Sequence, residues 1–246
     1  TEGILPPPQY FAKNAMMNKQ GVDSFDDVLK RGKVALDTDT FEAMANHEGA
    51  LVLDTRTREQ FAERHIPNSI FIGLDADFAP WVGALITDMK QPIVFVSEEG
   101  REEETVTRLS RVGYDNVLGY LEGGLETWVA AGKEVDQVNT VKPQEMVELY
   151  GQDDLNILDV RKPGEFSAEH VDGAESRPLD YINQTFNELD KDKTYHVYCA
   201  GGYRSMIFSS ILKSRGLHNV VNIQGGFDEL AKTSIPRTDY VCPSTL

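Results

Sequence analysis

One sequence pattern occurs twice in this chain, and this repeat constrains the fold more than any other feature. Each copy contains Leu-Asp-x-Arg, followed at identical spacing by a phenylalanine and a histidine, and later by Gly-x-x-Asn-Val and Gly-Gly. The matching positions are Asp54 and Asp159, Arg56 and Arg161, Phe61 and Phe166, His65 and His170, Asn116 and Asn219, and Gly124 and Gly226. Because self-similarity over such a length indicates a structural unit present more than once, the sequence predicts two copies of one fold.

Short apolar runs alternate with segments of helical character along the chain. The expected strands cover 50–53, 69–73 and 92–97, and the expected helices cover 38–46, 102–111 and 124–131, with one more short helix around 24–29 capped by Asp23 or Ser24. Parallel strands need crossover connections, which are usually helices, so this alternation favours a parallel sheet covered on both faces. The predicted class is α/β.

The junction between the copies is marked by Gly132, just after an expected helix end, and by Pro143, near an expected helix start. We place the boundary near residue 137, and the length of 246 residues suits two domains of ordinary size. The expected division is a lead-in or linker over 1–36, a first domain over 37–136, and a second domain with a C-terminal tail over 137–246.

Composition excludes several functional classes. The formal charge is −16, from 40 acidic and 24 basic residues, so the surface field should repel nucleic acid and anionic membranes. We see no transmembrane run and no signal peptide. Two cysteines do not form a disulfide framework, which favours a reduced, cytoplasmic setting. The first residue is Thr1, so we expect processing or a piece of a longer protein.

The stretch with the clearest chemistry runs from His196 to Ser205. An apolar run ends at Cys199, a short glycine-containing loop follows, and apolar residues then recur at helical spacing. Such a loop turns backbone N–H groups inward, and the helix dipole adds positive charge, so an anion in the loop is stabilised. We therefore predict a thiolate nucleophile at Cys199. The alternative is a buried structural cysteine.

These residues resemble a known family when they are taken with Glu165-Phe166 and Gln224-Gly225-Gly226. The set resembles the second copy of a tandem rhodanese, the sulfurtransferase family, over about 37–136 and 137–236. The resemblance implies two rhodanese-like α/β domains, each with a central parallel five-stranded sheet flanked by helices. It also implies a persulfide-forming cysteine in the loop after the fourth strand, and no cofactor or metal.

The activity implied is transfer of a sulfane sulfur from thiosulfate or a low-molecular-weight persulfide to a thiol or to cyanide, through a persulfide on Cys199. Arg204 is the second predicted catalytic residue, because its charge would stabilise the thiolate and attract an anionic donor; alternatively it pairs with a nearby carboxylate. The negative outer sulfur would be held by the amides of the loop, formed by Ala200, Gly201, Gly202, Tyr203 and Ser205. Gly201 and Gly202 suit a backbone that a Cβ would disfavour.

Several further residues are expected to act as framework. Ser205 is read first as a helix cap, with a bond to the cysteine sulfur as the second option. Asp159 and Arg161 are candidate supporting residues at the end of a strand, where ligands bind in α/β sheets. Their counterparts occur in the first copy without a cysteine, so a structural role is favoured, with Arg161 paired to Glu165 and Asp159 holding backbone amides. Both repeated histidines are read as structural.

The first copy departs from the active pattern. Its loop reads Val96-Ser97-Glu98-Glu99-Gly100-Arg101, so a serine or a valine stands where the cysteine belongs. A serine hydroxyl lacks thiolate character, and the glutamates would repel an anionic donor. We expect a non-catalytic scaffold.

The lead-in carries a narrower resemblance. The segments 5–11 and 73–83, with Asn18 and Gly21, resemble the part that follows a metallo-β-lactamase-fold domain in bacterial persulfide-dioxygenase fusions. A domain of that fold is therefore an expected partner, beside a small-molecule sulfur donor and a thiol acceptor. The chain has no His-x-His-x-Asp-His cluster, so no oxidation chemistry is assigned to it.

Two other functions stay open. Cysteine-dependent phosphatases and arsenate reductases have five residues between cysteine and arginine, whereas four separate Cys199 from Arg204. The smaller ring favours a single sulfur atom. The other alternative is a non-catalytic docking module of a larger sulfur-oxidising fusion. Cys242, in the tail, is read as a cysteine with no thiol partner, and a resolving or relay thiol is the alternative.

Overall fold

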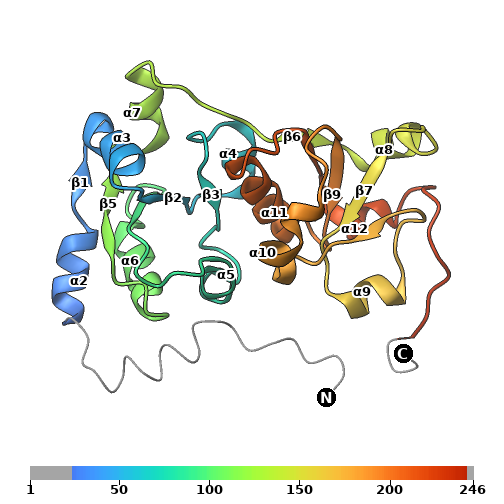
Figure 1. Cartoon of the computed structure of the whole chain (residues 1–246), viewed down its shortest axis with the longest axis horizontal. Helices are drawn as coiled ribbons and strands as arrows, with labels where there is room; N and C mark the ends of the chain where they lie inside the picture. The colour runs from blue at the N-terminus through green and yellow to red at the C-terminus, as the bar shows by residue number, and fades with distance from the viewer. Residues whose placement is uncertain (1–23, 243–246) are drawn as a thin grey trace. The chain divides into compact units, whose positions relative to one another are not determined.

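The computed structural model describes residues 24–242, and these fall into two compact units (Figure 1). The first unit ends at Asp136 and the second begins at Gln137. The predicted cap Asp23 and most of the lead-in that carries the narrower resemblance, residues 5–21, lie outside the described residues. Within 24–242, no helix is both long and apolar enough to cross a membrane.

The first unit is built on a five-stranded parallel sheet with the order β1-β5-β4-β2-β3. Its strands are β1 (Ala35–Leu36), β2 (Leu51–Asp54), β3 (Ile70–Phe71), β4 (Ile93–Val96) and β5 (Val117–Leu121). The middle strand is β4, and every one of its residues is buried. An apolar run without alternation is what a strand covered on both faces requires.

Helices connect these strands. They are α2 (Phe25–Gly32), α3 (Thr38–His47), α4 (Arg58–Glu63), α5 (Phe78–Leu85), α6 (Glu102–Ser110) and α7 (Gly124–Ala130). The cap of the first helix is Ser24, whose side chain accepts a hydrogen bond from the amide of Asp27 at 3.2 Å. The sequence offered Asp23 or Ser24 for this position, and Ser24 satisfies one of the amides that a helix start leaves unpaired.

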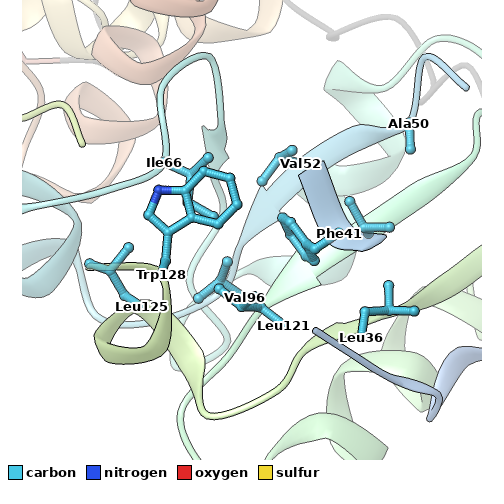
Figure 2. Packing of buried hydrophobic residues seen from close by; sticks show 10 residues of the cluster. Leu36, Phe41, Ala50, Val52, Ile66, Val96, Leu121, Leu125 and Trp128 are labelled. Carbon is cyan, nitrogen blue, oxygen red and sulfur yellow. The ribbon is translucent and has the colours of Figure 1, made fainter. Parts of the chain in front are cut away.

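One face of the first sheet packs against α3 and α7 (Figure 2). Phe41 of α3 and Trp128 of α7 meet edge to face, with their ring centroids 6.1 Å apart. Around them lie Leu36, Val52, Ile66, Val94, Val96, Leu121 and Leu125, all buried. Burying this apolar surface is the main favourable contribution to the stability of the unit.

The second unit repeats the sheet with the order β6-β10-β9-β7-β8, again parallel throughout. Its strands are β6 (Asn139–Val141), β7 (Asn156–Asp159), β8 (Glu175–Ser176), β9 (Tyr195–Tyr198) and β10 (Val220–Ile223). The predicted fold class, two α/β domains with parallel five-stranded sheets, is confirmed.

The helices of the second unit follow the same order. They are α8 (Pro143–Leu149), α9 (Pro163–Ala168), α10 (Ile182–Thr185), α11 (Tyr203–Ser214) and α12 (Gly226–Leu230), with 3₁₀ turns η1 (Leu179–Tyr181) and η2 (Phe186–Glu188) on either side of α10. Met146 of α8 and Leu230 of α12 are buried in one core with Ile157, Tyr198 and Ile223 of the sheet. In both units the middle strand, β4 or β9, leads into a loop and a helix, and this loop is where the predicted site lies.

Candidate active site

Cys199 directly follows β9, the middle strand of the second sheet. Its side chain is 1% exposed, and the loop 199–202 carries the chain from the strand into α11. The amide of Gly202 donates a hydrogen bond to the Cys199 Sγ at 3.1 Å. The predicted order of strand, short loop and helix is therefore present, with the sulfur turned toward the helix start.

The loop is held from behind by the first turn of α12. The amide of Phe227 donates to the carbonyl of Cys199 at 2.7 Å, and the amide of Asp228 donates to the carbonyl of Ala200 at 3.1 Å. With both carbonyls turned to α12, the loop presents N–H groups rather than carbonyl oxygens on the sulfur side. This is the arrangement in which successive amides bind an anion.

Two glycines are needed for this geometry. Gly202, the residue before α11, has φ 97°, a left-handed backbone conformation that residues other than glycine rarely adopt. Gly226 has φ 60°, and a Cβ there would lie 2.3 Å from the carbonyl oxygen of Cys199. For Gly201 the prediction is wrong, because its φ is not left-handed and a Cβ would meet only the Asp228 carboxylate, at 3.7 Å.

Ser205 is not the helix cap that the sequence predicts. The helix begins one turn earlier, after the left-handed Gly202, and Ser205 lies within its first turn. Its hydroxyl is fully buried and donates to the carbonyl of Gly202 at 3.2 Å. Ser205 therefore fixes the turn beneath the sulfur.

Arg204 pairs with a carboxylate, which is one of the two alternatives that the sequence left open. Its two terminal nitrogens donate to the two oxygens of Glu165, at 2.7 and 2.8 Å. The bond to Glu165 is the main cause that raises the pKa of Arg204, and the negative charge of Cys199 in its ionised form adds to it. Burial alone would raise the pKa of Glu165, but hydrogen bonds from Arg204 and the Lys162 amide outweigh burial and lower it. The arginine thus ties α11 to α9.

The predicted pair of Arg161 with Glu165 is wrong. Arg161 binds Asp159 instead, with the closest contact at 2.6 Å, and it also donates to the carbonyl of Glu169 at 2.7 Å. The prediction that Asp159 holds backbone amides is confirmed for one of them, that of Arg161, at 3.0 Å. A buried ion pair is stable only when its two charges lie close together. Asp159 and Arg161 are only two residues apart in the chain, so their side chains can meet.

The same arrangement occurs in the first unit, where no cysteine is present. Arg56 binds Asp54 at 2.6 Å and donates to the carbonyl of Arg64 at 2.9 Å. A contact shared by both units is expected for a framework role. In the second unit the guanidinium of Arg161 also lies over the rings of Phe227 and Tyr198, 4.0 and 5.6 Å from their centroids.

The two repeated histidines are also held alike. His65 Nδ1 bonds the carbonyl of Phe61 at 2.8 Å and stacks on its ring, and His170 does the same with Phe166 at 2.7 Å. A carbonyl only accepts, so Nδ1 carries the proton in both rings. This shared geometry fits the structural role predicted for them.

Ser97 occupies the position of Cys199 in the first unit. Asp54 pairs with Val96 in the sheet as Asp159 pairs with Tyr198, so the residue after the middle strand is Ser97 in one unit and Cys199 in the other. This decides between the serine and the valine that the sequence left open.

The contribution of α12 to the loop was not predicted from the sequence. The Gly-Gly before this helix was recognised as part of the repeat, and it was the available signal, because adjacent glycines before a helix allow another backbone to approach closely. Cys242 is exposed and forms no disulfide with the buried Cys199. Among residues 24–242, no group of three or more His, Cys, Asp or Glu side chains could hold a metal ion.

Comparisons with known proteins give the family. A model described as the rhodanese-like domain matches residues 37–131 and again residues 142–233. YqhL of Bacillus subtilis is 37% identical over 71 residues, which are 29% of this chain and 56% of YqhL. The probable adenylyltransferase/sulfurtransferase MoeZ of Mycobacterium tuberculosis is 34% identical over 101 residues, 40% of this chain and 26% of MoeZ. A sulfurtransferase of Allochromatium vinosum is 27% identical over 100 residues, 40% of this chain and 94% of that protein.

Two solved structures are similar in part. A rhodanese-related protein of Thermoplasma volcanium aligns with a TM-score of 0.38 and 26% identity, over 41% of this chain and 97% of that one. A thiosulfate sulfurtransferase of Pseudomonas aeruginosa aligns with a TM-score of 0.37 and 20% identity, over 85% of this chain and 44% of that one. This chain thus spans about half of YqhL and a quarter of MoeZ. Since the rhodanese-like model matches two separate stretches that cover most of the sequence, this chain belongs to the rhodanese-like family and carries two such domains in tandem.

Proposed function

We propose that the second domain is a sulfurtransferase that carries a sulfane sulfur on Cys199. The observation that supports this most is the loop 199–202, with the Gly202 amide 3.1 Å from Sγ and the carbonyls of Cys199 and Ala200 bonded to α12. Amides fixed in this way stabilise negative charge without reorganisation when it arrives. A persulfide places its charge on the outer sulfur, which lies one bond beyond Sγ.

The reaction has two displacements and no net oxidation. The Cys199 thiolate attacks the outer sulfur of thiosulfate or of a low-molecular-weight persulfide. The donor S–S bond breaks, and sulfite or a thiolate leaves with the bonding electron pair. An acceptor thiolate, or cyanide, then attacks the outer sulfur of Cys199-S-S⁻, and the cysteine leaves as a thiolate. Each step exchanges one nucleophile for another at sulfur.

The test is the intact mass of the protein after incubation with thiosulfate or with glutathione persulfide. We expect a gain of one sulfur atom, lost again when cyanide is added. Cys199→Ser should gain nothing, whereas Cys242→Ser, which removes the chain's other cysteine, should gain the same mass as the unchanged protein. An unchanged mass of the native protein with both donors would contradict the proposal and favour a docking module.

The phosphatase alternative has less support. Only four residues separate Cys199 from Arg204, and the guanidinium of Arg204 is already bonded to Glu165 through two nitrogens. An arginine so engaged has fewer donors left for a tetrahedral oxyanion. Turnover of an aryl phosphate that depends on Cys199 would revive this alternative.

Two parts of the proposal concern the rest of the protein. The first domain serves as a non-catalytic scaffold, because Ser97 replaces the cysteine and cannot hold a persulfide. The resemblance of the lead-in to dioxygenase fusions supports a metallo-β-lactamase-fold domain as a partner, and with it a small persulfide as donor. A pull-down with such a domain, followed by transfer of labelled sulfur to Cys199, tests this part.

A further inference from the structure

In the second domain, the guanidinium of Arg161 packs on two aromatic rings. Its central carbon lies 4.0 Å from the ring centroid of Phe227 and 5.6 Å from that of Tyr198. The two rings are themselves stacked, with their centroids 6.1 Å apart and their planes 25° apart. A guanidinium over an aromatic face is attracted by the negative potential of that face. We call these three side chains the arginine stack.

The guanidinium of Arg161 is fixed from its other side. It donates hydrogen bonds to the carboxylate of Asp159 at 2.6 Å and to the carbonyl of Glu169 at 2.7 Å. Burial alone would lower the pKa of Arg161, but the hydrogen bond and the charge of Asp159 outweigh burial and raise it, so the group stays cationic. A cation held in one place holds the ring of Phe227 in one place as well.

The backbone of Phe227 holds the sulfur loop. Its amide donates to the carbonyl of Cys199 at 2.7 Å, and the amide of Asp228 donates to the carbonyl of Ala200 at 3.1 Å. Both amides lie in the first turn of α12, and amides in the first turn of a helix have no partner within that helix. Phe227 therefore joins the arginine stack, through its ring, to the loop, through its amide.

The first domain has the same arginine without the rings. Val96 and Leu125 stand at the positions of Tyr198 and Phe227. In the part of the chain that the structure describes, no backbone hydrogen bond joins the carbonyl of Ser97 to α7. The helix after the Gly-Gly pair is thus bonded to the loop in the domain with the rings and stands apart from it in the domain without them.

We propose that Phe227 is a positioning residue for sulfur transfer, which acts through its backbone amide on the carbonyl of Cys199. The contact with Arg161 fixes the ring, the ring fixes the first turn of α12, and this turn keeps the loop carbonyls away from the sulfur. This inference rests on the function proposed for Cys199, but the order of the loop can be measured without a sulfur donor.

Amide hydrogen exchange, followed by NMR on the full chain, tests the positioning itself. In Phe227→Leu, which introduces the residue type of the first domain, the amides of residues 227 and 228 should exchange about tenfold faster, because no ring binds Arg161. Phe227→Tyr keeps the ring and should restore slow exchange. If Phe227→Leu does not fold, Phe227→Met replaces it, since a long flexible side chain without a ring can fill the gap. Exchange as slow as in the unchanged protein would overturn the proposal.

Phe186→Leu is the matched control. Phe186 is half-buried in η2 of the same domain, and Lys191 and Arg215 lie 5.9 and 5.3 Å from its ring centroid. Arg215 follows the last residue of α11, whereas the sulfur loop precedes the first. The control therefore removes a similar contact at the other end of the helix. Equal acceleration of exchange at residues 227 and 228 in the control would reduce the effect to a general loss of stability and overturn the proposal.

Timed sulfur loading measures the consequence for the reaction. At saturating thiosulfate, loading of Phe227→Leu should be about tenfold slower with a nearly unchanged KM, because a positioning residue does not contact the donor. Phe227→Tyr should recover the rate, and Phe186→Leu should keep it. An unchanged loading rate in Phe227→Leu, or a KM that rises several-fold instead, would contradict the positioning role. If the unchanged protein takes up no sulfur, the function proposed for Cys199 fails, whereas the exchange rates still decide whether Phe227 holds the loop.

Discussion

A Cβ on Gly226 would lie only 2.3 Å from the carbonyl oxygen of Cys199. This contact shows how two distant parts of the sequence make one loop, because the helix that starts at Gly226 supplies the amides that hold the carbonyls of Cys199 and Ala200. The geometry at the sulfur therefore depends on the absence of a side chain in a helix that carries no catalytic group.

We predict that Gly226→Ala nearly abolishes sulfur loading. The new methyl group must displace the loop, and a shift of about 1 Å at a reacting group lowers rates by about 100-fold. Intact mass after timed exposure to thiosulfate measures the rate of loading.

Gly124→Ala is the matched control for this change. Both glycines have left-handed φ, 60° at Gly226 and 63° at Gly124, so alanine costs about 1 kcal/mol at either position. At Gly124 the methyl group would lie 3.7 Å from the nearest carbonyl, an ordinary contact. Unfolding in urea should show the smaller loss of stability for Gly124→Ala, because only the methyl group on Gly226 must also displace backbone atoms, and loading should fall only for Gly226→Ala. Equal loading rates in the two variants would show that the loop tolerates the displacement.

The repeat explains why so much of the fold could be predicted. The same residue types follow Asp54 and Asp159 at the same intervals, which predicts the same sheet in each copy. The apolar runs that precede these two aspartates predict its buried strands. Hydrophobic pattern and spacing are properties of the local sequence, so strands and helices can be predicted from them without knowledge of tertiary contacts.

Side-chain partners could not be predicted in the same way. Glu165 was assigned to Arg161, four residues earlier, but it binds Arg204, which lies 39 residues further along the chain. Arg161 is instead bonded to Asp159 on its own turn. Which pairing forms depends on how α9 and α11 are placed by the sheet, and the sequence contains no local signal for it. The helix start at Gly202 was missed for a related reason, since left-handed glycine replaced the expected serine cap.

We predict that Glu165 and Arg204 act as one positioning pair. In a double-mutant cycle of Glu165→Gln and Arg204→Gln, urea unfolding should give a coupling energy of about 1–2 kcal/mol. If Arg204 acts through Glu165, both single variants should slow sulfur loading alike, and the double variant should be no slower.

The KM for thiosulfate separates this role from direct substrate binding. A positioning pair changes the loading rate at saturating donor and leaves the KM nearly equal in both single variants. If Arg204→Gln raises the KM several-fold while Glu165→Gln does not, Arg204 touches the donor and is a catalytic residue.

Asp228 should discriminate against highly charged donors. Its carboxylate lies 3.7 Å from the position of a Cβ on Gly201, beside the loop, and repels a dianion such as thiosulfate. Asp228→Asn keeps the backbone amide that holds Ala200, so we expect kcat/KM for thiosulfate to rise about threefold at low salt. The gain should shrink as salt is added, and it should be smaller for a persulfide of lower charge.

Glu148→Gln is the control for this variant, because it removes an exposed carboxylate from α8 in the same domain. It should leave both donors unaffected. A gain that is equal for the two donors, or that persists at high salt, would show that Asp228 does not select by charge.

His196 should make the stability of the second domain depend on pH. Burial lowers the pKa of His196 below its ordinary value of about 6.5, and its Nδ1 is buried without a hydrogen-bond partner among the described residues. Its neighbours in the sheet register are Ile157 and Val221. The folded domain therefore resists protonation of this ring, while the unfolded chain accepts the proton at its ordinary pKa. Above about pH 6.5 the ring is neutral in both states, and as pH falls through the interval down to the lowered pKa, the free energy of unfolding decreases.

His196→Leu removes this proton uptake and suits the apolar neighbours. The stability of this variant should therefore fall less steeply than that of the unchanged protein between pH 7.5 and pH 5.5, a range set about the ordinary pKa. Urea unfolding at each pH measures the difference. His218→Leu, at an exposed position, is the matched control and should keep the full slope. Parallel pH profiles for His196→Leu and the unchanged protein would show that another group causes the acid sensitivity.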